Sequence, residues 1–298
     1  MLRPPLFLGR VTEMSSRKST ACVAFQGEFG ANSDLAGRAT FPERETLPCV
    51  TFEDVFAAVR SGKAAFGMIP IDNSIAGRVA DIHHLLPKSG THIIGEHFQP
   101  IEHQLLATRG ASLRTVKEAH SHVHALAQCR EFLRKHGIKP VVVEDTAGAA
   151  RAVSALHDQK IAAIASPLAG KLYGLTVLAK KIEDRPHNIT RFVIISKRLT
   201  IPKVGEGRVI TSLFFRLRSV PAALYKAIGG FASTGVNLLK LESYLNGDFQ
   251  TAEFYIEAEA HPAELRMQHA LDELKFFSEE IRVLGVYPAN RYRAREKA

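Results

Sequence analysis

Short apolar segments alternate with segments of helical periodicity from residue 21 to about residue 196, and this alternation restricts the possible folds more than any other feature. Such an order of strands and helices is typical of α/β layers, in which helices cover a sheet. The pattern predicts strands at 22–25, 64–69, 91–95, 141–144, 161–165 and 192–196, and helices at 52–61, 79–86, 125–136 and 147–157.

The chain of 298 residues is long enough for two domains at about 150 residues each. Within the first of them, the part from Pro100 to about Leu178 has a strand–helix alternation of its own. The chain then returns toward the first strands through residues 188–196. A chain that leaves one lobe and returns to it is expected to form two lobes with a cleft between them.

Residues 197–207 contain Pro202, Gly205 and Gly207 among several charges, which predicts a linker. Beyond it, residues 208–290 show strand and helix patterns in the order βαββαβ, with Asn246-Gly247 as the turn of the central hairpin. This order predicts a second domain with a ferredoxin-like fold.

Polar side chains gather beside three of the predicted strands. The loop after the first strand ends in Asn32 and Ser33, which are favourable N-caps, and the N–H groups at a helix start favour an anion. The segment Asp72-Asn73-Ser74 follows the second strand, and Asn188-Ile189-Thr190-Arg191 leads into the last one. Polar loops at strand ends are what a binding cleft between α/β lobes uses.

The formal net charge is +9, and residues 291–297 form the densest basic run. A positive charge attracts anions in general. No helix-turn-helix, zinc-finger or aromatic–basic strand pattern accompanies it, so nucleic acid is not expected as a partner. A dianionic small molecule is compatible with the charge.

The three cysteines, Cys22, Cys49 and Cys129, lie far apart, which fits a reducing cytosol better than a disulfide framework. No apolar run approaches the roughly 18 residues that span a bilayer, so no membrane is expected as a partner. The N-terminal apolar run is too short for a secretory signal, and Met14 is an alternative start that would make residues 1–13 a leader. We therefore expect a cytoplasmic protein.

Three histidines, His120, His122 and His124, alternate along the chain, and histidines on one face of a strand can bind zinc. No cysteine or nearby carboxylate completes a tetrahedral set, so no metal is expected. The spacing Gly27-x-x-Gly30 is too short for a dinucleotide fingerprint, so no such cofactor is expected either.

Taken together, the polar clusters resemble those of the prephenate dehydratase family. The family pattern Pro-x-Glu-Asn-Ser-x-x-Gly-x-Val is similar to residues 70–79, with Asp72 in place of the glutamate. Thr-Arg-Phe matches residues 190–192, and Gly-x-x-Gly-Ala-x-Ser matches residues 27–33. The resemblance extends over roughly residues 20–290 and implies a bilobal, periplasmic-binding-protein-like catalytic domain at 20–200, with the second lobe at about 101–178.

The resemblance implies the conversion of prephenate to phenylpyruvate, an aromatisation that expels a hydroxyl group and CO2 and needs no cofactor. Thr190 would contact the leaving hydroxyl, while Asn73 and Ser74 would orient substrate oxygens. Further substrate contacts are implied for Asn32, Ser33 and Phe192. Arg191 is either a substrate clamp or an ion-pair partner, because on a strand it points to the face opposite Thr190.

Residues 208–290 resemble an ACT domain, the amino-acid-sensing module of such enzymes, which implies phenylalanine as effector and at least a homodimer or a homotetramer. The family's Glu-Ser-Arg-Pro motif is replaced here by Glu242-Ser243-Tyr244-Leu245, so the strength of sensing is expected to differ. The residues expected at the effector are Ala222, Ala223, Leu224, Asn237, Leu238, Glu242 and Ser243.

Four alternatives remain open from the sequence. The first is that the substrate is arogenate instead of prephenate, and the second is that the protein binds a small ligand without catalysis. The third is a basic regulatory protein, and the fourth is that the ACT-like domain serves assembly alone.

Overall fold

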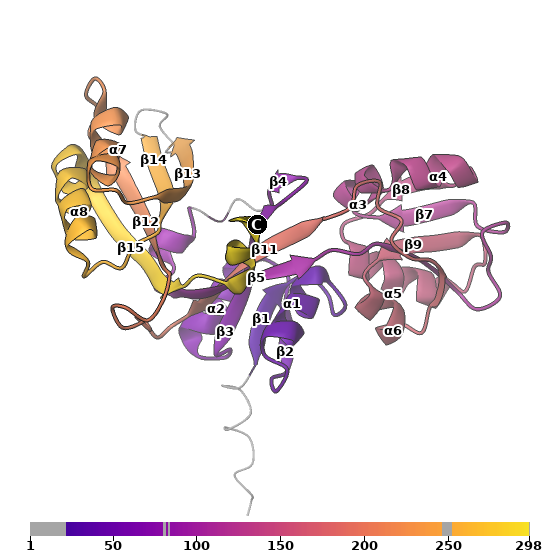
Figure 1. Cartoon of the computed structure of the whole chain (residues 1–298). Coiled ribbons are helices and arrows are strands. Elements are labelled where there is room, and N and C mark those ends of the chain that lie inside the picture. The colour runs from indigo at the N-terminus through magenta and orange to yellow at the C-terminus, as the bar shows by residue number, and fades with distance from the viewer. Residues whose placement is uncertain (1–21, 80–81, 83, 246–251, 298) are drawn as a thin grey trace, which may run out of the picture.

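The computed structural model of the protein describes residues 22–79, 82, 84–245 and 252–297. They form three parts in an elongated molecule, with a first lobe in the centre, a second lobe at one end and a C-terminal domain at the other (Figure 1). The suggested leader at residues 1–13 and the Asn246-Gly247 turn lie outside the described residues.

The first lobe is built on one half of a long mixed sheet, in the order β5-β11-β3-β1-β2. Strands β1, β2 and β3 are parallel, whereas β11 runs antiparallel to both β3 and β5. Its elements are β1 (Val23–Gln26), α1 (Asn32–Thr40), β2 (Thr46–Cys49), α2 (Phe52–Ser61), β3 (Phe66–Asn73), β4 (Gly77–Arg78), β5 (His92–Pro100) and β11 (Ile189–Ser196).

The second lobe has a separate five-stranded sheet in the order β10-β6-β9-β7-β8. The chain enters it after β5 and leaves it before β11, so two crossings connect the lobes, as the return of the pattern predicts. Its elements are β6 (Gln104–Ala107), β7 (Glu118–Ser121), α3 (Val123–Gln128), α4 (Arg130–His136), β8 (Lys139–Val142), α5 (Thr146–Leu156), β9 (Ile161–Ala165), α6 (Pro167–Leu172) and β10 (Thr176–Ala179).

Two predicted helices differ from the structure. The helix expected at 125–136 is two helices, because Cys129 between them leaves the helical conformation at φ −121° and ψ 23°. The helix expected at 79–86 is not seen in the part of that segment that is described, where a 3-10 helix begins only at Leu86. Residues 80, 81 and 83 of that segment lie outside the described residues.

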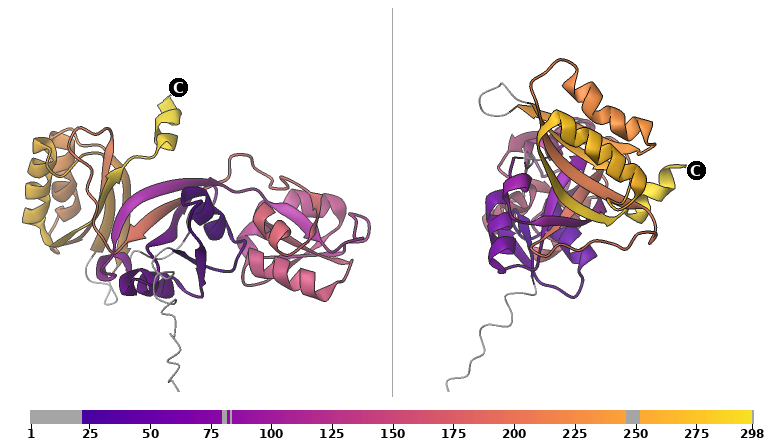
Figure 2. Two further views of the ribbon diagram at one scale, coloured as in Figure 1. Left: turned by 90° about the horizontal axis from the view of Figure 1, so that it is seen from below. Right: turned by 90° about the vertical axis from the view of Figure 1, so that its left-hand side faces the viewer.

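The C-terminal domain has the order βαββαβ and the sheet order β13-β14-β12-β15, which makes the chain an α/β protein with a bilobal domain and a ferredoxin-like one. Helices α7 and α8 pack on the outer face of this sheet, away from the first lobe (Figure 2). Its elements are β12 (Val209–Leu217), α7 (Ala223–Ser233), β13 (Leu238–Leu245), β14 (Ala252–Ala258), α8 (Leu265–Phe277) and β15 (Ser278–Pro288), followed by a 3-10 turn, η3 (Arg291–Lys297).

The inner face of this sheet shares a hydrophobic core with the first lobe, where Phe214 and Tyr255 pack in one cluster with Ile69 and Val193. The two sheets also join, because β15 pairs with β5 at Gly285 and Ile93, giving one 10-stranded sheet. A Cβ atom at Gly285 would lie 2.0 Å from the Ile93 carbonyl oxygen, so this junction requires glycine. The C-terminal domain is therefore packed directly against the strands that carry the site.

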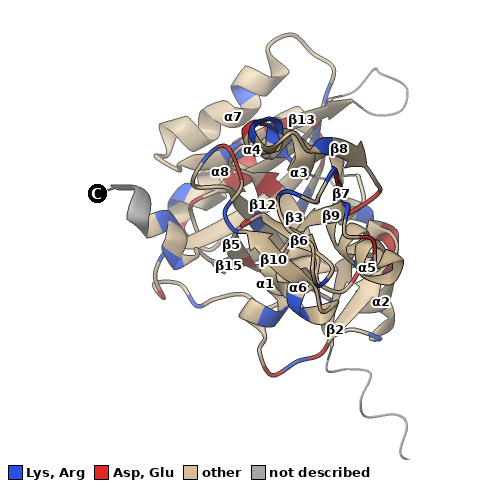
Figure 3. Ribbon diagram, turned by 90° about the vertical axis from the view of Figure 1, so that its right-hand side faces the viewer, with Lys and Arg blue, Asp and Glu red and all other residues tan. Residues whose placement is uncertain are grey.

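Charged residues of both signs are mixed along the chain rather than gathered in one segment, as the view toward the second lobe shows (Figure 3). Among the described residues, none of the helices has the length and apolar character needed to cross a membrane.

Candidate active site

A cavity of about 410 Å³ lies between the two lobes. Parallel strands of both lobes end there, so side chains that are distant in sequence meet at one place. The polar lining residues of the first lobe are Gln26, Asn32, Ser33, Asn73, Arg78, Asn188 and Thr190. Those of the second lobe and its connections are His103, His122, His124, Gln128, Glu144, Asp145 and Thr146.

Asn73 and Thr190 form a directly opposed pair on the antiparallel strands β3 and β11. The Asn73 side-chain oxygen accepts hydrogen bonds from the backbone N–H groups of Ile75 (3.0 Å) and Ala76 (2.8 Å). Since these donors fix the amide orientation, Nδ2 of Asn73 must face Thr190, and it donates to Thr190 Oγ1 at 3.0 Å.

The orientation of the Asn73 amide in turn fixes the orientation of three further side chains, which are linked by hydrogen bonds. Asn73 Nδ2 also donates to Asn188 Oδ1 (2.7 Å), and Asn188 Nδ2 donates to Gln128 Oε1 (2.8 Å). His103 Nε2 lies 2.8 Å from that same oxygen and is therefore the donor. Burial lowers the pKa of His103 below its ordinary value of 6.5, so the ring is neutral at pH 7.

Thr190 consequently accepts a hydrogen bond and keeps its own O–H for another partner. Among the described residues its hydroxyl makes no second hydrogen bond. Thr190 is 8% exposed and Asn73 is 9% exposed, so both are held rigidly at the cavity wall. A fixed hydroxyl donor supported by a buried amide suits stabilisation of a leaving oxygen that gains negative charge.

Two helices of more than two turns begin at the cavity, α1 at Asn32 and α5 at Thr146. Asn32 and Ser33 were expected to be N-caps, but the N-cap of α1 is Ala31, which makes no side-chain cap bond. The side chains of Asn32 and Ser33 form no hydrogen bond with another described residue. Together with the first N–H groups of α1 they are available for a carboxylate.

The loop from Gly27 to Gly30 contacts the second lobe and sets the distance between the lobes. Glu28 forms a two-bond ion pair with Arg151 at 2.6 and 2.7 Å, and the Gly30 carbonyl accepts from Ser166 Oγ at 2.6 Å. Gly30 has φ +90°, and a Cβ atom on it would lie 2.8 Å from Ala169 Cα. Close approach of the lobes thus depends on glycine at this position.

Of the other expected site residues, Phe192 lines the cavity, whereas Ser74 and Arg191 do not. The Ser74 hydroxyl donates to the His187 carbonyl at 2.9 Å and accepts from the Ile189 N–H at 2.9 Å, so it joins β3 to the start of β11. Arg191 points to the reverse face of β11 and binds carboxylates there. Side chains alternate between the two faces of a strand, so Arg191 points away from the cavity that Thr190 lines. Arg191 is therefore an ion-pair partner and not a substrate clamp.

Sequence reasoning did not assign site roles to Gln128, His103, Arg78, Asp145 or Thr146. Gln128 and His122 lie in residues 121–129, a segment whose sequence is also similar to one of the family, and this similarity could have pointed to them. Arg78 carried no signal, because it occupies an unspecified position of the family pattern.

The residues expected at an effector do not lie together, and Glu242 is bound by Lys240 in the middle of β13. Ala222, Ala223 and Leu224 border a hollow of about 470 Å³ at the start of α7. Asn237 lies at the opposite end of β13, where it donates to Glu259 at 3.2 Å. Within one chain these residues therefore do not converge.

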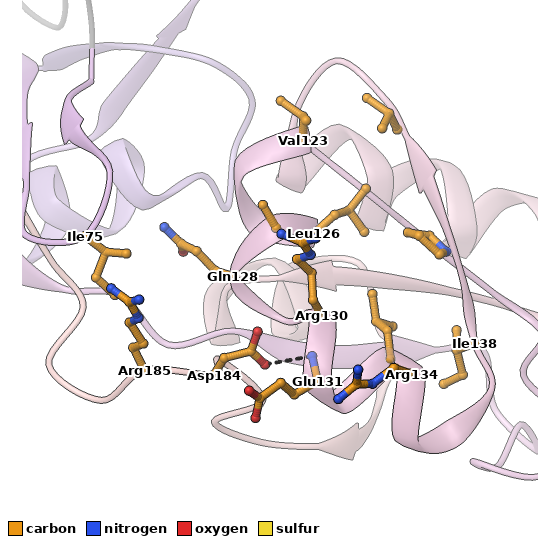
Figure 4. A pocket seen from close by; sticks show the side chains of 14 residues that line it. Ile75, Val123, Leu126, Gln128, Arg130, Glu131, Arg134, Ile138, Asp184 and Arg185 are labelled. Carbon is orange, nitrogen blue, oxygen red and sulfur yellow. Dashed lines mark hydrogen bonds between the residues drawn. The ribbon is translucent and has the colours of Figure 1, made fainter.

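A larger hollow of about 970 Å³ lies beside α3 and α4, with Arg130, Arg134 and Arg185 around it (Figure 4). It shares Gln128 with the cleft. Its described side chains do not converge into a network like that of Asn73 and Thr190, so volume alone does not identify the site. The described residues also contain no group of three or more His, Cys, Asp or Glu side chains suited to a metal ion.

Comparison with known proteins gives consistent matches. The family model described as prephenate dehydratase matches residues 23–200. A bifunctional N-acyl-homoserine lactone acylase/prephenate dehydratase of Komagataeibacter europaeus is 48% identical over 273 residues, covering 91% of this chain and 97% of that protein. Arogenate dehydratase/prephenate dehydratase 2 of Arabidopsis thaliana is 36% identical and covers 97% of this chain and 78% of that protein.

Two solved structures are similar over most of their length. GqqA, described as a novel type of quorum-quenching acylase, has a TM-score of 0.86 and 48% identity, with 91% of this chain and 99% of that chain covered. The prephenate dehydratase of Arthrobacter aurescens in complex with L-Phe has a TM-score of 0.81 and 32% identity, with 90% and 89% covered.

Proposed function

Because the chain belongs to the prephenate dehydratase family and is therefore a lyase, we propose that it converts prephenate to phenylpyruvate in phenylalanine biosynthesis. The single observation that supports this assignment most is the opposed pair of Asn73 and Thr190, which presents one oriented hydroxyl to the cleft. Decarboxylative dehydration needs such a donor at the departing oxygen.

In the proposed reaction the prephenate dianion gives the phenylpyruvate anion, CO2 and hydroxide, which takes a proton from solvent to become water. The bond from the ring to its carboxylate breaks, and its electrons enter the ring as the C–O bond to the hydroxyl breaks. Thr190 donates a hydrogen bond to that oxygen, and the bond strengthens as negative charge develops. The N–H of Asn73 supports the Thr190 oxygen at 3.0 Å.

The side-chain carboxylate of prephenate would bind at the start of α1, near Asn32 and Ser33. Arg78 is the only Lys or Arg among the described residues that line the cavity, and it supplies positive charge for a dianion. The ring carboxylate must stay free of strong donors, because hydrogen bonds to it would oppose loss of CO2. The ring would pack against Phe192.

Arogenate is the second candidate substrate, because two carboxylates lie in the cavity. Glu144 and Asp145 line the cavity and would attract the ammonium group that arogenate carries in place of the keto group. Asp145 Oδ1 is already engaged by the Gly148 N–H at 2.6 Å, which reduces its capacity for a second donor. Prephenate therefore remains the proposed substrate.

Side-by-side initial rates with prephenate and arogenate should give the higher kcat/KM for prephenate. The two substrates differ only in the keto and ammonium groups, so the ratio reports directly on that part of the site. A kcat/KM several-fold higher for arogenate would contradict the proposed substrate while leaving the lyase assignment intact.

We do not extend the acylase activity named for the Komagataeibacter protein to this chain. Amide hydrolysis by a hydroxyl nucleophile needs an adjacent base. Among the described residues, neither Thr190 nor Ser33 hydrogen-bonds to a histidine.

Phenylalanine is the proposed feedback inhibitor, acting at the C-terminal domain. The structural relative from Arthrobacter aurescens was solved in complex with L-Phe. In this chain we place the effector at the hollow beside Ala222–Leu224. A second copy of the chain, in a homodimer or homotetramer, would bring Asn237, Leu238 and Ser243 to such a hollow, whereas the Glu242 carboxylate is bound by Lys240 within one chain. We propose a cytoplasmic location for the assembled enzyme.

Addition of phenylalanine should lower the initial rate, and tyrosine, which adds one hydroxyl group, should act more weakly. The apolar border of the hollow, including Leu217 and Phe254, is the physical reason for this preference. Initial rates across a phenylalanine titration test it. Phenylalanine binding, seen by calorimetry, that leaves both rate and KM unchanged would reduce the domain to an assembly module.

A further inference from the structure

The strand pair that carries the candidate catalytic residues has a second polar pair on its reverse face. Thr190 is opposite Asn73, and the next residues, Arg191 and Asp72, are opposite each other. Side chains alternate along strands, so one pair faces the cleft and the other faces the C-terminal domain. Asp72 is bonded to Asn73 and Arg191 to Thr190, so a shift of the strand backbone at the reverse-face pair also shifts the pair at the cleft.

Arg191 is held by three carboxylates from three different strands. Its guanidinium donates to Asp72 at 3.1 Å, to Glu96 of β5 at 3.0 Å, and to Glu257 of β14. The side chain of Arg191 is 8% exposed, and those of Glu96 and Glu257 are fully buried. Glu257 belongs to the C-terminal domain, so a residue outside the lobes fixes the strand that bears Thr190.

Asp72 is held from the C-terminal domain as well. Lys240 of β13 donates to Asp72 and to Glu242, both at 2.5 Å. Arg293, from η3, binds Glu96 at 2.8 Å and Glu257 at 3.2 Å and so balances the carboxylates around Arg191. The charged groups thus form one cluster with members on both sides of the domain boundary, buried at Glu96 and Glu257 and partly exposed at Asp72.

Glu257 is the buried carboxylate of this cluster that belongs to the C-terminal domain, and it keeps its negative charge beside Arg191. Burial alone would raise the pKa of Glu257, but the positive charge of Arg191 and the hydrogen bonds to the carboxylate keep it below 4.5. The Tyr255 hydroxyl donates to Glu257 at 2.7 Å and adds to this effect. Glu257 and Arg191 therefore form an ion pair at neutral pH.

A second contact reaches the cleft directly. Arg78, which lines the cavity, lies with its guanidinium 5.2 Å from the ring centroid of Tyr244 and 4.0 Å from Glu242. Both partners are on β13, the strand that also carries Lys240. One strand of the C-terminal domain therefore contacts a wall of the cleft and the reverse face of the catalytic pair.

We propose that Glu257 and Lys240 of the C-terminal domain are positioning residues for the reaction, which they support by holding Arg191 and Asp72 and thereby aligning Thr190 and Asn73. This inference rests on the proposed function. It assigns the C-terminal domain a part in basal catalysis, apart from effector binding. It also gives an effector bound to this domain a physical route to the site, since a shift of β13 or β14 changes the alignment.

The test compares full-length variants in the prephenate assay, with thermal unfolding and circular dichroism as folding controls. Lys240→Met removes the contact to Asp72, and Lys240→Arg keeps its charge. Glu257→Gln removes one carboxylate from Arg191. Glu253→Gln is the matched control, because Glu253 lies on the same face of the same strand and pairs with Arg216 at 2.6 Å, away from β11.

We expect Lys240→Met and Glu257→Gln to lower kcat about tenfold with little change in KM, since alignment affects the transition state more than binding. Lys240→Arg should recover most of the loss, and Glu253→Gln should match the wild type.

If Glu257→Gln fails to fold, the two Lys240 variants are sufficient for the test. Folded Lys240→Met protein with the wild-type kcat would overturn the inference, as would an equal loss in Glu253→Gln. An inactive wild type would instead contradict the proposed function.

Discussion

Thr190→Ala should lower kcat about a hundredfold and leave KM nearly unchanged. Loss of one oriented donor to a developing oxyanion costs on the order of 3 kcal/mol in the transition state. The effect falls on kcat because the hydrogen bond strengthens only as the leaving oxygen gains charge. The measurement is steady-state kinetics with prephenate on purified variants of matched folding.

Thr190→Ser provides the control for this prediction. Serine keeps the hydroxyl and its contact with Asn73 Nδ2 but loses the methyl group, so most of the rate should remain. A Thr190→Ala enzyme with the wild-type kcat, or a serine variant as slow as the alanine variant, would remove the hydroxyl from the mechanism.

Arg191→Met should lower the free energy of unfolding by about 3–5 kcal/mol. The substitution leaves Glu96 and Glu257 buried, with Arg293 as their remaining cationic partner. Burial of uncompensated charge is the physical reason, and methionine is long enough to fill the space of the arginine stem. Urea-induced unfolding monitored by circular dichroism gives the value.

Arg216→Met is the matched control for this stability effect. Arg216 also pairs with two carboxylates, Glu253 and Glu280, but its side chain is 31% exposed. Exposed pairs contribute about 0–1 kcal/mol, so this variant should unfold close to the wild type. Equal losses in the two variants would show that burial of the Arg191 cluster has no special energetic role.

The order of elements and part of the site follow from the sequence because they depend on local rules. Strand periodicity places Asn73 and Thr190 at the cleft ends of neighbouring strands, and the same periodicity predicts that Arg191 points away from the cleft. The βαββαβ order of the C-terminal domain also follows from spacing and turn signals.

Other features depend on contacts that no local pattern encodes. Glu257 meets Arg191 across 66 residues, and Lys240 meets Asp72 across 168 residues. The junction of the two sheets at Gly285 and Ile93 likewise depends on how the C-terminal domain packs against the first lobe. The break at Cys129 and the N-cap of α1 at Ala31 were also not predicted, because residue types alone set helix ends only approximately.

The most direct test of the assignment is the turnover of prephenate by the purified full-length protein, followed by the ultraviolet absorbance of phenylpyruvate and by released CO2. The account predicts that the two products form in equal amounts without added cofactor, and that Thr190→Ala slows both equally. Formation of neither product by folded wild-type protein, or equal rates in wild type and Thr190→Ala, would contradict it.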